Sequence, residues 1–373
     1  MRTLRRYTIL AIGAGYMAAT WSVAEPARAQ PPRTQPPRTV SWRECLTQPT
    51  SWYASDEARR IAENVLAYQR DSGGWPKNID MAAPLSPEDR QAIQQQRNQP
   101  DATIDNGATH TQLRFLARVV QQTADQRCRE AFLEGFDYLI AAQYPGGGWP
   151  QCYPQPRGYA RHITFNDDAM VGVLNLLRDI TRYEASFRFV DAERRERAAE
   201  AVERGTECIL RCQVIVDGQR TAWCAQHDHE TELPAPARSY ELVSLSGHES
   251  VGIVRYLMGI ENPPPEVLAA VQGAVAWFDQ VQLRGIRVER QAAGDLPGGF
   301  DRVVVRDEAA PPLWARFYEI GSNRPIFSGR DGIVRRELAE IEHERRTGYA
   351  WYVSSPRRLL QDEYPAWRAR WLP

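Results

Sequence analysis

An internal echo in the chain limits its fold more than any other feature. The segment QRDSGGWP at 69–76 returns as QYPGGGWP at 143–150. A second pair follows, TIDNGA at 103–108 and TFNDDA at 164–169, whose members lie 61 residues apart. That spacing is about the length of two helices with their loops, so the sequence predicts repeated helical hairpins.

Helical periodicity surrounds these segments. Apolar residues recur at spacings of three and four, and Glu249 followed by Val254 and Leu257 resembles a fainter third copy. The expected helices are Ala58–Tyr68, Thr111–Thr123, Glu130–Gln143, Met170–Arg182, Ala192–Gln213, Glu249–Met258 and Pro265–Val281. Strand signals are few: 213–225 around the turn Asp217-Gly218, and Ile286–Val288 with Arg302–Val305.

Helical hairpins repeated in this way close most naturally into a ring of inner and outer helices. The sequence therefore predicts a mainly all-α fold, an (α/α)3 toroid or barrel with a few short strands and long irregular loops. The glycine-rich turns and polar caps should gather at one mouth of the ring. A site is expected there, because loops on a rigid scaffold carry function.

Composition excludes several classes of protein. The 373 residues are 43% hydrophobic and 25% charged, which excludes a collagen, a polytopic membrane protein and a wholly disordered chain. The formal net charge is −1, so no basic surface for nucleic acid is expected. An anionic partner would have to be held by a local cluster of arginines.

The first residues indicate export. Arg2, Arg5 and Arg6 precede an apolar stretch and then Ala27-Arg28-Ala29, so 1–29 is interpreted as a secretory signal peptide. Residues 30–40 are a proline-rich linker, and 41–373 are expected to form one domain that has no membrane association after cleavage. An uncleaved membrane anchor is the alternative. Localisation is thus extracellular or periplasmic.

Six cysteines follow the signal, an even number that permits disulfides in an exported chain. We expect one or two structural disulfides and no catalytic thiol. Cys208 and Cys212 stand four apart in a helical pattern, a spacing that seldom makes a good bridge, so Cys212–Cys224 is as plausible. The run His227-Asp228-His229-Glu230 is interpreted as a structural polar loop, because four consecutive residues point in different directions. A zinc site is the alternative, since zinc prefers histidine or cysteine ligands.

Acidic and amide side chains stand before two of the expected helices. Asp105 and Asn106 precede one, and Asn166, Asp167 and Asp168 precede the other. Such residues are usually helix caps. In equivalent positions of a ring, however, their oxygens can converge on one centre, and oxygen ligands suit a hard cation, above all calcium.

Basic residues form a second group on irregular loops. Lys77 and Asn78 follow the first GGWP, Arg238 lies in PARSYE, and Arg324 and Arg330 lie in GSNRPIFSGRDG. Each alone could form a surface salt bridge. Together with 11 tryptophans they suit an anionic sugar, because a guanidinium matches a carboxylate and an aromatic ring covers a pyranose. If the substrate is a uronan, calcium and arginine together would neutralise its C6 carboxylate and acidify the neighbouring C5 proton. A base could then remove that proton, and the C4–O4 bond would break by β-elimination.

The segments GGWPKN, TIDNGAT, GGGWPQ with TFNDDAM, PARSYELVSLSG and RFYEIGSNRPIFSGRDG resemble those of pectate lyases of polysaccharide lyase family 10. The resemblance runs from about Ser51 to Tyr352. It implies an (α/α)3 toroid and calcium-assisted elimination on polygalacturonate, which yields 4,5-unsaturated oligosaccharides. The expected enzyme is a monomer whose partner is the pectate chain.

By motif position the resemblance also assigns roles. It implies that Arg238 is the catalytic base and that Asp105, Asn106 and Asp167 are calcium ligands. It implies substrate binding by Arg324 and Arg330, with Lys77 and Asn78 near the cleft. If Arg238 were only a clamp, Lys77 would be the next candidate base.

Other classes of function are left open by the residues. A terpene-cyclase-like α/α barrel is one, since glutamine followed by Gly-x-Trp resembles the QW turns of such enzymes and the run Asn166-Asp167-Asp168 resembles an acidic motif. A non-catalytic pectin-binding module is a second. An inverting hydrolase, which would release reducing ends without an unsaturated product, is a third.

Overall fold

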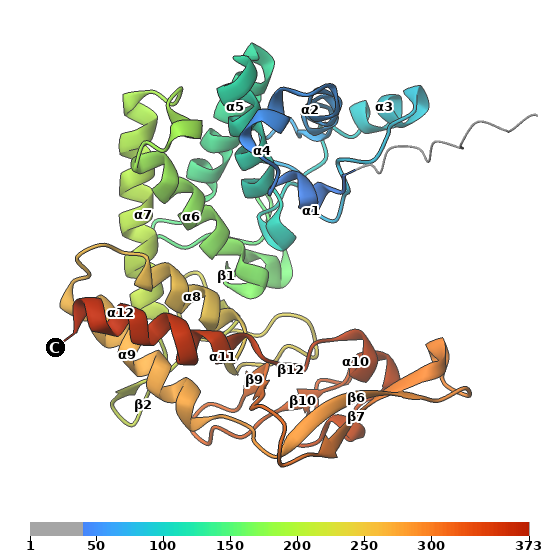
Figure 1. Ribbon diagram of the computed structural model, residues 1–373, viewed down its shortest axis with the longest axis vertical. Coiled ribbons are helices and arrows are strands. Elements are labelled where there is room, and N and C mark those ends of the chain that lie inside the picture. Colours follow the sequence, from blue (N-terminus) through green and yellow to red (C-terminus); the bar gives the residue numbers. More distant parts are fainter. Residues whose placement is uncertain (1–39, 373) are drawn as a thin grey trace, which may run out of the picture. The chain divides into compact units, whose positions relative to one another are not determined.

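The repeated segments of the sequence lie in the loops between the helices of a mainly helical fold (Figure 1). The structure is a computed structural model that describes residues 40–372, which belong to one compact unit, Val40–Pro373. The predicted signal peptide (1–29) and all but the last residue of the predicted linker (30–40) lie outside the described residues.

All seven predicted helices are present. The α-helices of the described residues are α1 (Trp42–Cys45), α2 (Asp56–Tyr68), α3 (Pro87–Gln94), α4 (His110–Thr123), α5 (Gln126–Ala142), α6 (Ala169–Thr181), α7 (Ala192–Cys212), α8 (Glu249–Met258), α9 (Pro265–Gln280), α10 (His343–Gly348), α11 (Ser355–Arg358) and α12 (Tyr364–Trp371). The helix α3 was not predicted, because Ile93 is its only buried residue and gives no apolar periodicity.

The helices are arranged in two rows. Helices α4, α6 and α8 pack against one another, as do α5, α7 and α9, and each member of the first row packs against the next helix in sequence. The helix α2 contacts both α4 and α5 and extends the second row. This confirms the α/α toroid with a few short strands and long loops, although the described helices do not close into a barrel.

The strands form two-stranded antiparallel ribbons that connect the loops. Their pairs are β1 (Ile163–Thr164) with β4 (Gln226–His227), β2 (Ile215–Val216) with β3 (Gln219–Arg220), β5 (Leu245–Ser246) with β9 (Phe317–Tyr318), β6 (Ile286–Ala292) with β7 (Phe300–Arg306), β8 (Trp314–Ala315) with β12 (Tyr352–Val353), and β10 (Phe327–Ser328) with β11 (Val334–Arg335). Both predicted strand pairs are present, as β2–β3 and β6–β7.

The second row is the outer one, and a glutamine just after each of its helices α2, α5 and α7 joins that helix to the next outer helix. Gln69 Nε2, after α2, donates to the carbonyls of Gly73 (2.8 Å) and of Ala131 in α5 (2.9 Å). Gln143 and Gln213 repeat both bonds: the first reaches Gly147 and a carbonyl of α7, and the second reaches Thr221 and a carbonyl of α9. The structure therefore contains a third copy, in which the β2–β3 hairpin separates Gln213 from Trp223.

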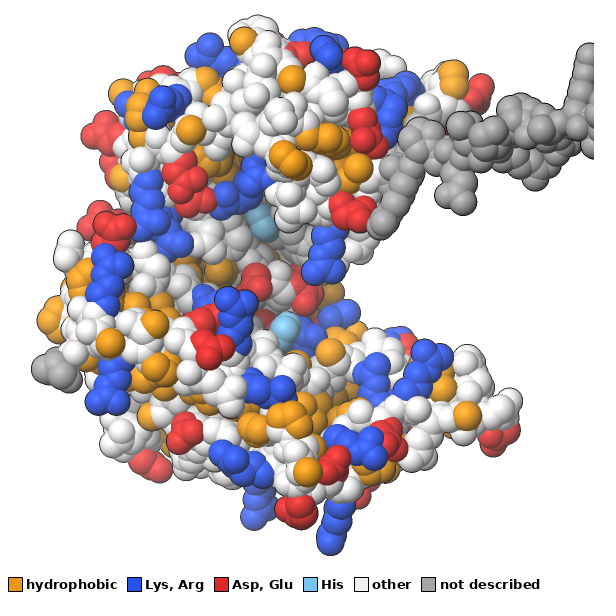
Figure 2. Space-filling model, viewed as in Figure 1, with side chains coloured by type: hydrophobic (Ala, Val, Ile, Leu, Met, Phe, Trp, Pro, Cys, Tyr) orange, Lys and Arg blue, Asp and Glu red, His pale blue; other side chains and the backbone are white. Residues whose placement is uncertain are grey.

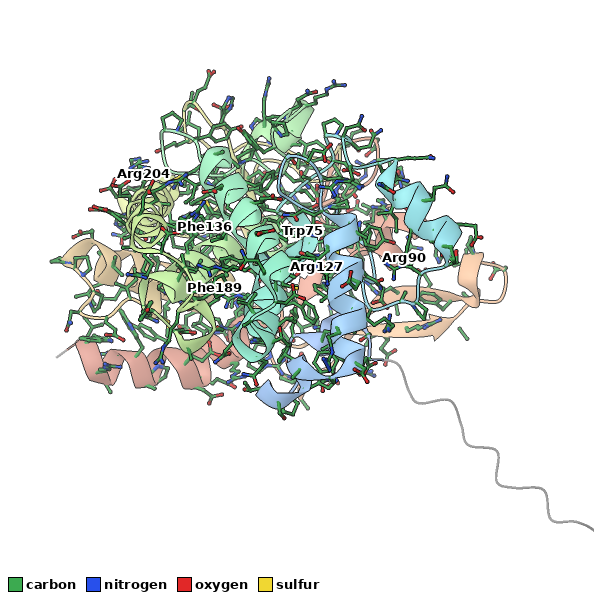
Figure 3. All side chains as sticks on the ribbon, turned by 90° about the horizontal axis from the view of Figure 1, so that it is seen from above. Trp75, Arg90, Arg127, Phe136, Phe189 and Arg204 are labelled. Carbon is green, nitrogen blue, oxygen red and sulfur yellow. The ribbon has the colours of Figure 1, made fainter. Side chains whose placement is uncertain are left out.

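The tryptophan of each copy fastens the following loop to the same helix. The indole Nε1 atoms of Trp75, Trp149 and Trp223 donate to carbonyls of α2, α5 and α7 at 2.7, 2.8 and 2.7 Å. All three rings are fully buried. Trp75 lies between α2 and α5 (Figure 3), where its ring would contact any Cβ added at Gly135.

The first glycine of the GG pair is required by two constraints at once. Gly73 and Gly147 have φ values of +95° and +94°, which favour glycine. An added Cβ would lie 2.5 Å from the Glu134 carbonyl oxygen in one copy and 2.1 Å from that of Arg204 in the other. The loops therefore cross the next outer helix at a distance that only glycine permits.

The hydrophobic core has two parts. The larger lies between the two rows of helices, and the smaller lies beneath the C-terminal loops around Tyr240, Phe317, Phe327 and Trp351. The expected disulfides are wrong: all six cysteines are free thiols, and Cys224 Sγ donates to the carbonyl of Ala235. Five are buried and act as small apolar residues of the interior.

We predict that Gln69→Met destabilises the fold. The variant removes both hydrogen bonds and leaves the buried Gly73 carbonyl without a donor, so the free energy of unfolding should fall by about 2–4 kcal/mol. Urea unfolding at constant m value measures the change. Gln122→Met, at an exposed position of α4, is the matched control and should change stability by less than about 0.5 kcal/mol. Equal stabilities of the two variants would contradict the prediction.

Candidate active site

Two short 3₁₀ turns bring the paired acidic segments together. They are η2 (Asp105–Gly107) and η4 (Asn166–Asp168), which pack against each other. Asn106 (φ 50°, ψ 34°) and Asp167 (φ 51°, ψ 36°) occupy the same left-handed conformation at equivalent positions. Asparagine and aspartate tolerate this conformation better than most residues. The echo in the sequence thus corresponds to a repeated backbone geometry.

Backbone contacts hold both turns in place. Ile104 N donates to the Gln151 carbonyl (3.1 Å), and Asp105 N donates to Thr103 Oγ1 (3.1 Å). Asn166 N donates to the Ala225 carbonyl at 2.9 Å, beside the β1–β4 ribbon. Each turn is therefore held by the loop that follows a tryptophan. The loop after Trp149 holds η2 through Gln151, and the loop after Trp223 holds η4 through Ala225.

The turns border a cavity of about 150 Å³. Its lining consists of Lys77, Asn78, Asp105, Asn106, Gln151, Tyr159, Asn166, Asp167, Gln226, Arg238 and Glu241. Six of the eight predicted site residues are in this set. Gln151, Tyr159, Gln226 and Glu241 were missed. One face of the described part is hollowed, and acidic and basic side chains gather there (Figure 2).

A larger cavity does not carry comparable chemistry. It measures about 450 Å³ and lies between α2, α3 and α5. Its charged residues include Arg127, which forms an exposed ion pair with Glu63. The smaller cavity is the better candidate, because its carboxylates and cations come from separate loops and face one space.

Oxygen atoms without hydrogen-bond donors mark this cavity. Asp105 is buried, and its Oδ2 accepts from Gln151 Nε2 (2.5 Å) and pairs with Lys77 Nζ. Asp105 Oδ1, Gln151 Oε1 and Gln226 Oε1 are buried and have no partner in the structure. Buried acceptors are normally satisfied, so these three indicate a missing electropositive group. The set of oxygen donors fits a hard cation such as Ca²⁺.

Arg316 contacts the second turn and was missed by the sequence reasoning. This buried guanidinium pairs with Glu249 of α8, and its Nη2 lies 3.3 Å from Asn166 Oδ1 and 3.4 Å from Asp167 Oδ1. Tyr349 lies beneath it, with the ring centroid 4.6 Å from Cζ. Arg316 begins the motif RFYEIGSNRPIFSGRDG, but a single arginine there has no spacing that indicates a role.

Arg238 lies on a tight turn and is held by Glu241. Its Nε donates to Glu241 Oε2 (2.7 Å) and its Nη2 pairs with Oε1. The rings of Tyr240 and Tyr349 lie 5.0 and 5.7 Å from Cζ. The hydrogen bond to Glu241 raises the pKa of Arg238 above its ordinary value, so this arrangement favours the protonated guanidinium.

The other predicted residues fall into two groups. Asn78 Oδ1 accepts from Asn106 Nδ2 (2.8 Å), so Lys77 and Asn78 both contact η2. Arg324 and Arg330 are exposed and do not line the cavity. Arg330 pairs with Glu344 (2.9 Å). Its loop nevertheless passes close to the turn that carries Arg238, because a Cβ added at Gly332 would lie 3.2 Å from the Ser239 carbonyl oxygen. The structure does not test their predicted roles.

Comparison with known proteins identifies the family. The sequence profile of the pectic acid lyase family matches residues 69–360. The chain belongs to this family. The fold resembles that of the family 10 polysaccharide lyase from Cellvibrio cellulosa, with 33% identity, a TM-score of 0.72 and coverage of 85% of this chain and 94% of the other.

A second structure of the Cellvibrio cellulosa lyase is an Asp-to-Ala variant in complex with trigalacturonic acid. It has 32% identity, a TM-score of 0.72 and coverage of 85% of this chain and 95% of the other. None of the curated proteins compared with the chain matches it. The protein is thus a polysaccharide lyase of the pectate lyase type, as the motifs predicted. The terpene-cyclase-like and purely binding alternatives are not supported.

The buried pair of Arg316 and Glu249 yields a second prediction. Arg316→Met should lower the free energy of unfolding by about 3–5 kcal/mol, because it leaves Glu249 buried without its cation. Urea unfolding measures the loss. The double variant Arg316→Met with Glu249→Gln should recover part of it, since no unpaired charge is left. A single variant as stable as the parent would contradict this account.

Proposed function

We propose that the protein cleaves de-esterified polygalacturonate by calcium-assisted β-elimination. The observation that supports this most strongly is the 150 Å³ cavity, where Asp105, Asp167 and Arg238 face one another. The Cellvibrio cellulosa lyase binds trigalacturonic acid, a short form of the same polymer. We further propose that calcium is held by Asp105, Asn106 and Asp167, whose oxygen atoms suit it.

The proposed reaction needs an acidified C5 proton and a base. Calcium bound to the galacturonate C6 carboxylate would lower the pKa of the neighbouring C5–H. An unprotonated Arg238 takes the C5 proton, the electrons form the C4–C5 double bond, and the C4–O4 bond breaks. The released O4 is protonated by water. Lys77, Asn78, Arg324 and Arg330 are proposed to bind the carboxylates of the chain.

The base must first lose its own proton. Guanidinium ions have a pKa above about 12, and Glu241 raises that of Arg238 further. The proposed reaction therefore requires that Arg238 leave Glu241 when substrate and calcium bind, so that Lys77 and the metal ion surround it instead. An alkaline pH optimum is expected.

The proposal extends to the location of the enzyme. We infer that 1–29 are removed on export, that 30–40 form a linker and that 41–373 act as one monomeric catalytic domain. The arginines and the apolar stretch before Ala29 support export. Within residues 40–372, no helix is long and apolar enough to cross a membrane.

The activity is tested with polygalacturonate at alkaline pH, followed by the ultraviolet absorbance of the unsaturated product. A chelator should abolish the signal, and Ca²⁺ should restore it. Asp105→Asn should raise the Ca²⁺ concentration for half-maximal rate by roughly tenfold or more, because the ligand loses its charge. The control Asp71→Asn alters an exposed ion pair with Arg97 and should leave it unchanged. Reducing ends without absorbance would indicate a hydrolase instead.

The base assignment predicts a pH effect. Glu241 stabilises protonated Arg238, so Glu241→Gln should lower the pKa of Arg238 and increase its unprotonated fraction at a given pH. The midpoint of the alkaline rise in kcat/KM should then move to lower pH, while Arg238→Ala should give no product at any pH. An unmoved midpoint in Glu241→Gln, or near-normal turnover in Arg238→Ala, would contradict the assignment.

A further inference from the structure

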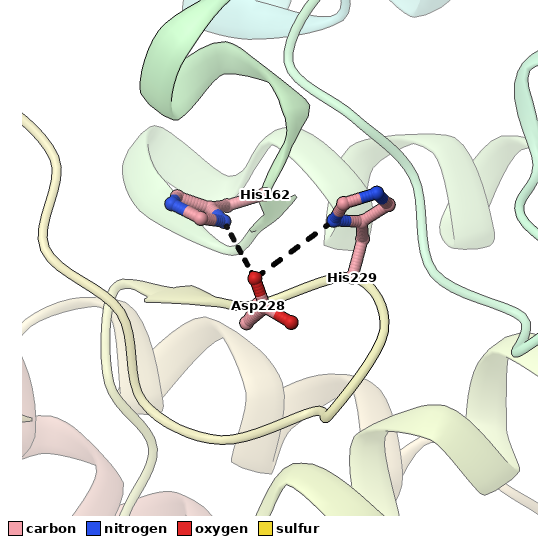
Figure 4. A group of neighbouring side chains, drawn as sticks. All are labelled: His162, Asp228 and His229. Carbon is pink, nitrogen blue, oxygen red and sulfur yellow. Dashed lines mark ion pairs between the residues drawn. The ribbon is translucent and has the colours of Figure 1, made fainter.

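Strand pairing brings together three metal-ligating side chains that lie apart in the sequence. In the β1–β4 ribbon, Ile163 pairs with His227. Continuing this antiparallel register places His162 opposite Asp228, and His229 follows directly. Figure 4 shows both imidazole rings turned toward the Asp228 carboxylate. None of the three residues lines the 150 Å³ cavity.

The distances leave room for an ion. His162 Nδ1 lies 3.7 Å from Asp228 Oδ2, and His229 Nδ1 lies 3.9 Å from the same oxygen. These separations are too long for hydrogen bonds. The three ligand atoms all lie within 4.8 Å of one another. Both Nδ1 atoms are buried and lack any hydrogen-bond partner, so each presents a lone pair or a proton to an unfilled point.

The surrounding contacts orient the carboxylate for this purpose. Asp228 Oδ1 accepts from the backbone N of Glu230 (3.1 Å), the backbone N of Thr231 (3.0 Å) and Thr231 Oγ1 (3.1 Å). That leaves Oδ2 free to face the rings.

The contacts of the neighbouring residues show which side chains of the run 227–230 face the cluster. Tyr144 packs against the ring of His229 at a centroid distance of 5.0 Å, and the far nitrogen of His229 lies 3.9 Å from Glu230 Oε1. His227 is turned away, since its Nδ1 contacts the Glu232 carbonyl at 2.8 Å. The run 227–230 thus points in different directions, as expected, but His162 supplies the ligand that the run lacks.

We propose that His162, Asp228 and His229 bind one divalent transition-metal ion through two Nδ1 atoms and Oδ2, with water completing the shell. Two nitrogens and one oxygen suit Zn²⁺ rather than Ca²⁺, which prefers oxygen alone. Tetrahedral zinc places its ligand atoms about 3.3 Å apart, so each histidine–aspartate distance would shorten by about half an ångström. This is a different site and a different ion from those proposed for catalysis.

The ion would brace the ribbon behind the catalytic cavity. Gln226 on β4 and Asn166 just after β1 both line that cavity, and Gln226 Nε2 lies 3.4 Å from Thr164 Oγ1. A bond from His162 to Asp228 and His229 through a metal would fix the far end of the same pair of strands. Its function is structural, and it takes no part in proton transfer.

Metal titration of the chelator-treated full chain tests the proposal. Calorimetry with Zn²⁺ should give one site per chain, and Co²⁺ should give the intense visible absorption of a four-coordinate ion. Excess Ca²⁺ should displace neither. His162→Gln and Asp228→Asn should each weaken Zn²⁺ binding by roughly tenfold or more. Asp228→Asn keeps Oδ1 for the turn, so its loss of binding is separable from misfolding, which circular dichroism monitors.

A histidine elsewhere provides the matched control. His343 is part-buried and contacts one backbone carbonyl, that of Phe300, at 2.8 Å. His343→Gln should therefore bind Zn²⁺ like the parent. No Zn²⁺ binding by the parent chain, equal binding by all three variants, or a Co²⁺ spectrum typical of six oxygen ligands would overturn the proposal. None of these readouts depends on lyase activity.

Discussion

The rest of the structure depends on the glutamine that follows each of the outer helices α2, α5 and α7 and links it to the next outer helix. A single side chain spans two carbonyls, one in its own loop and one in the neighbouring helix, at nearly equal distances in all three copies. The carbonyl in the loop of Gln69, that of Gly73, is buried and accepts its hydrogen bond from this side chain, so an apolar residue of similar size would leave it unsatisfied. Spacing and rotation between successive hairpins are thereby fixed, and so is the point where each following loop begins.

That regularity explains how carboxylates from distant segments meet. The loop after each tryptophan returns across the mouth of the ring and ends in a turn before an inner helix. Because the first two copies have the same geometry, η2 and η4 present Asp105 and Asp167 to one cavity. The third copy diverges at this point. It places Ser246 and Glu249 beside Arg316, so the acidic side of the site is balanced by a buried cation from the β5–β9 region.

The sequence predicted the parts that repeat or follow a period. Helical periodicity located seven helices, and the echo located both acidic turns. Gln213, the third glutamine, was missed because the β2–β3 hairpin separates it from Trp223. The insertion breaks up the sequence motif, but Gln213 still makes both hydrogen bonds. Arg316 and the opposition of His162 to Asp228 depend on strand register between segments more than 60 residues apart. No local pattern encodes such a register, since it follows from how the loops are anchored.

The electrostatics of Arg238 connect the fold to the proposed chemistry. Glu241, Tyr240 and Tyr349 all stabilise the protonated guanidinium of Arg238 and hold this side chain at the edge of the cavity. A base with that environment would be inactive. The Tyr349 hydroxyl also donates to Glu241, and its ring lies beneath Arg316. One side chain thus contacts both the Arg238–Glu241 pair and the Arg316–Glu249 pair. Release of Arg238 from Glu241 would therefore also change the contacts of Tyr349, the ring that connects this pair to the buried guanidinium of Arg316.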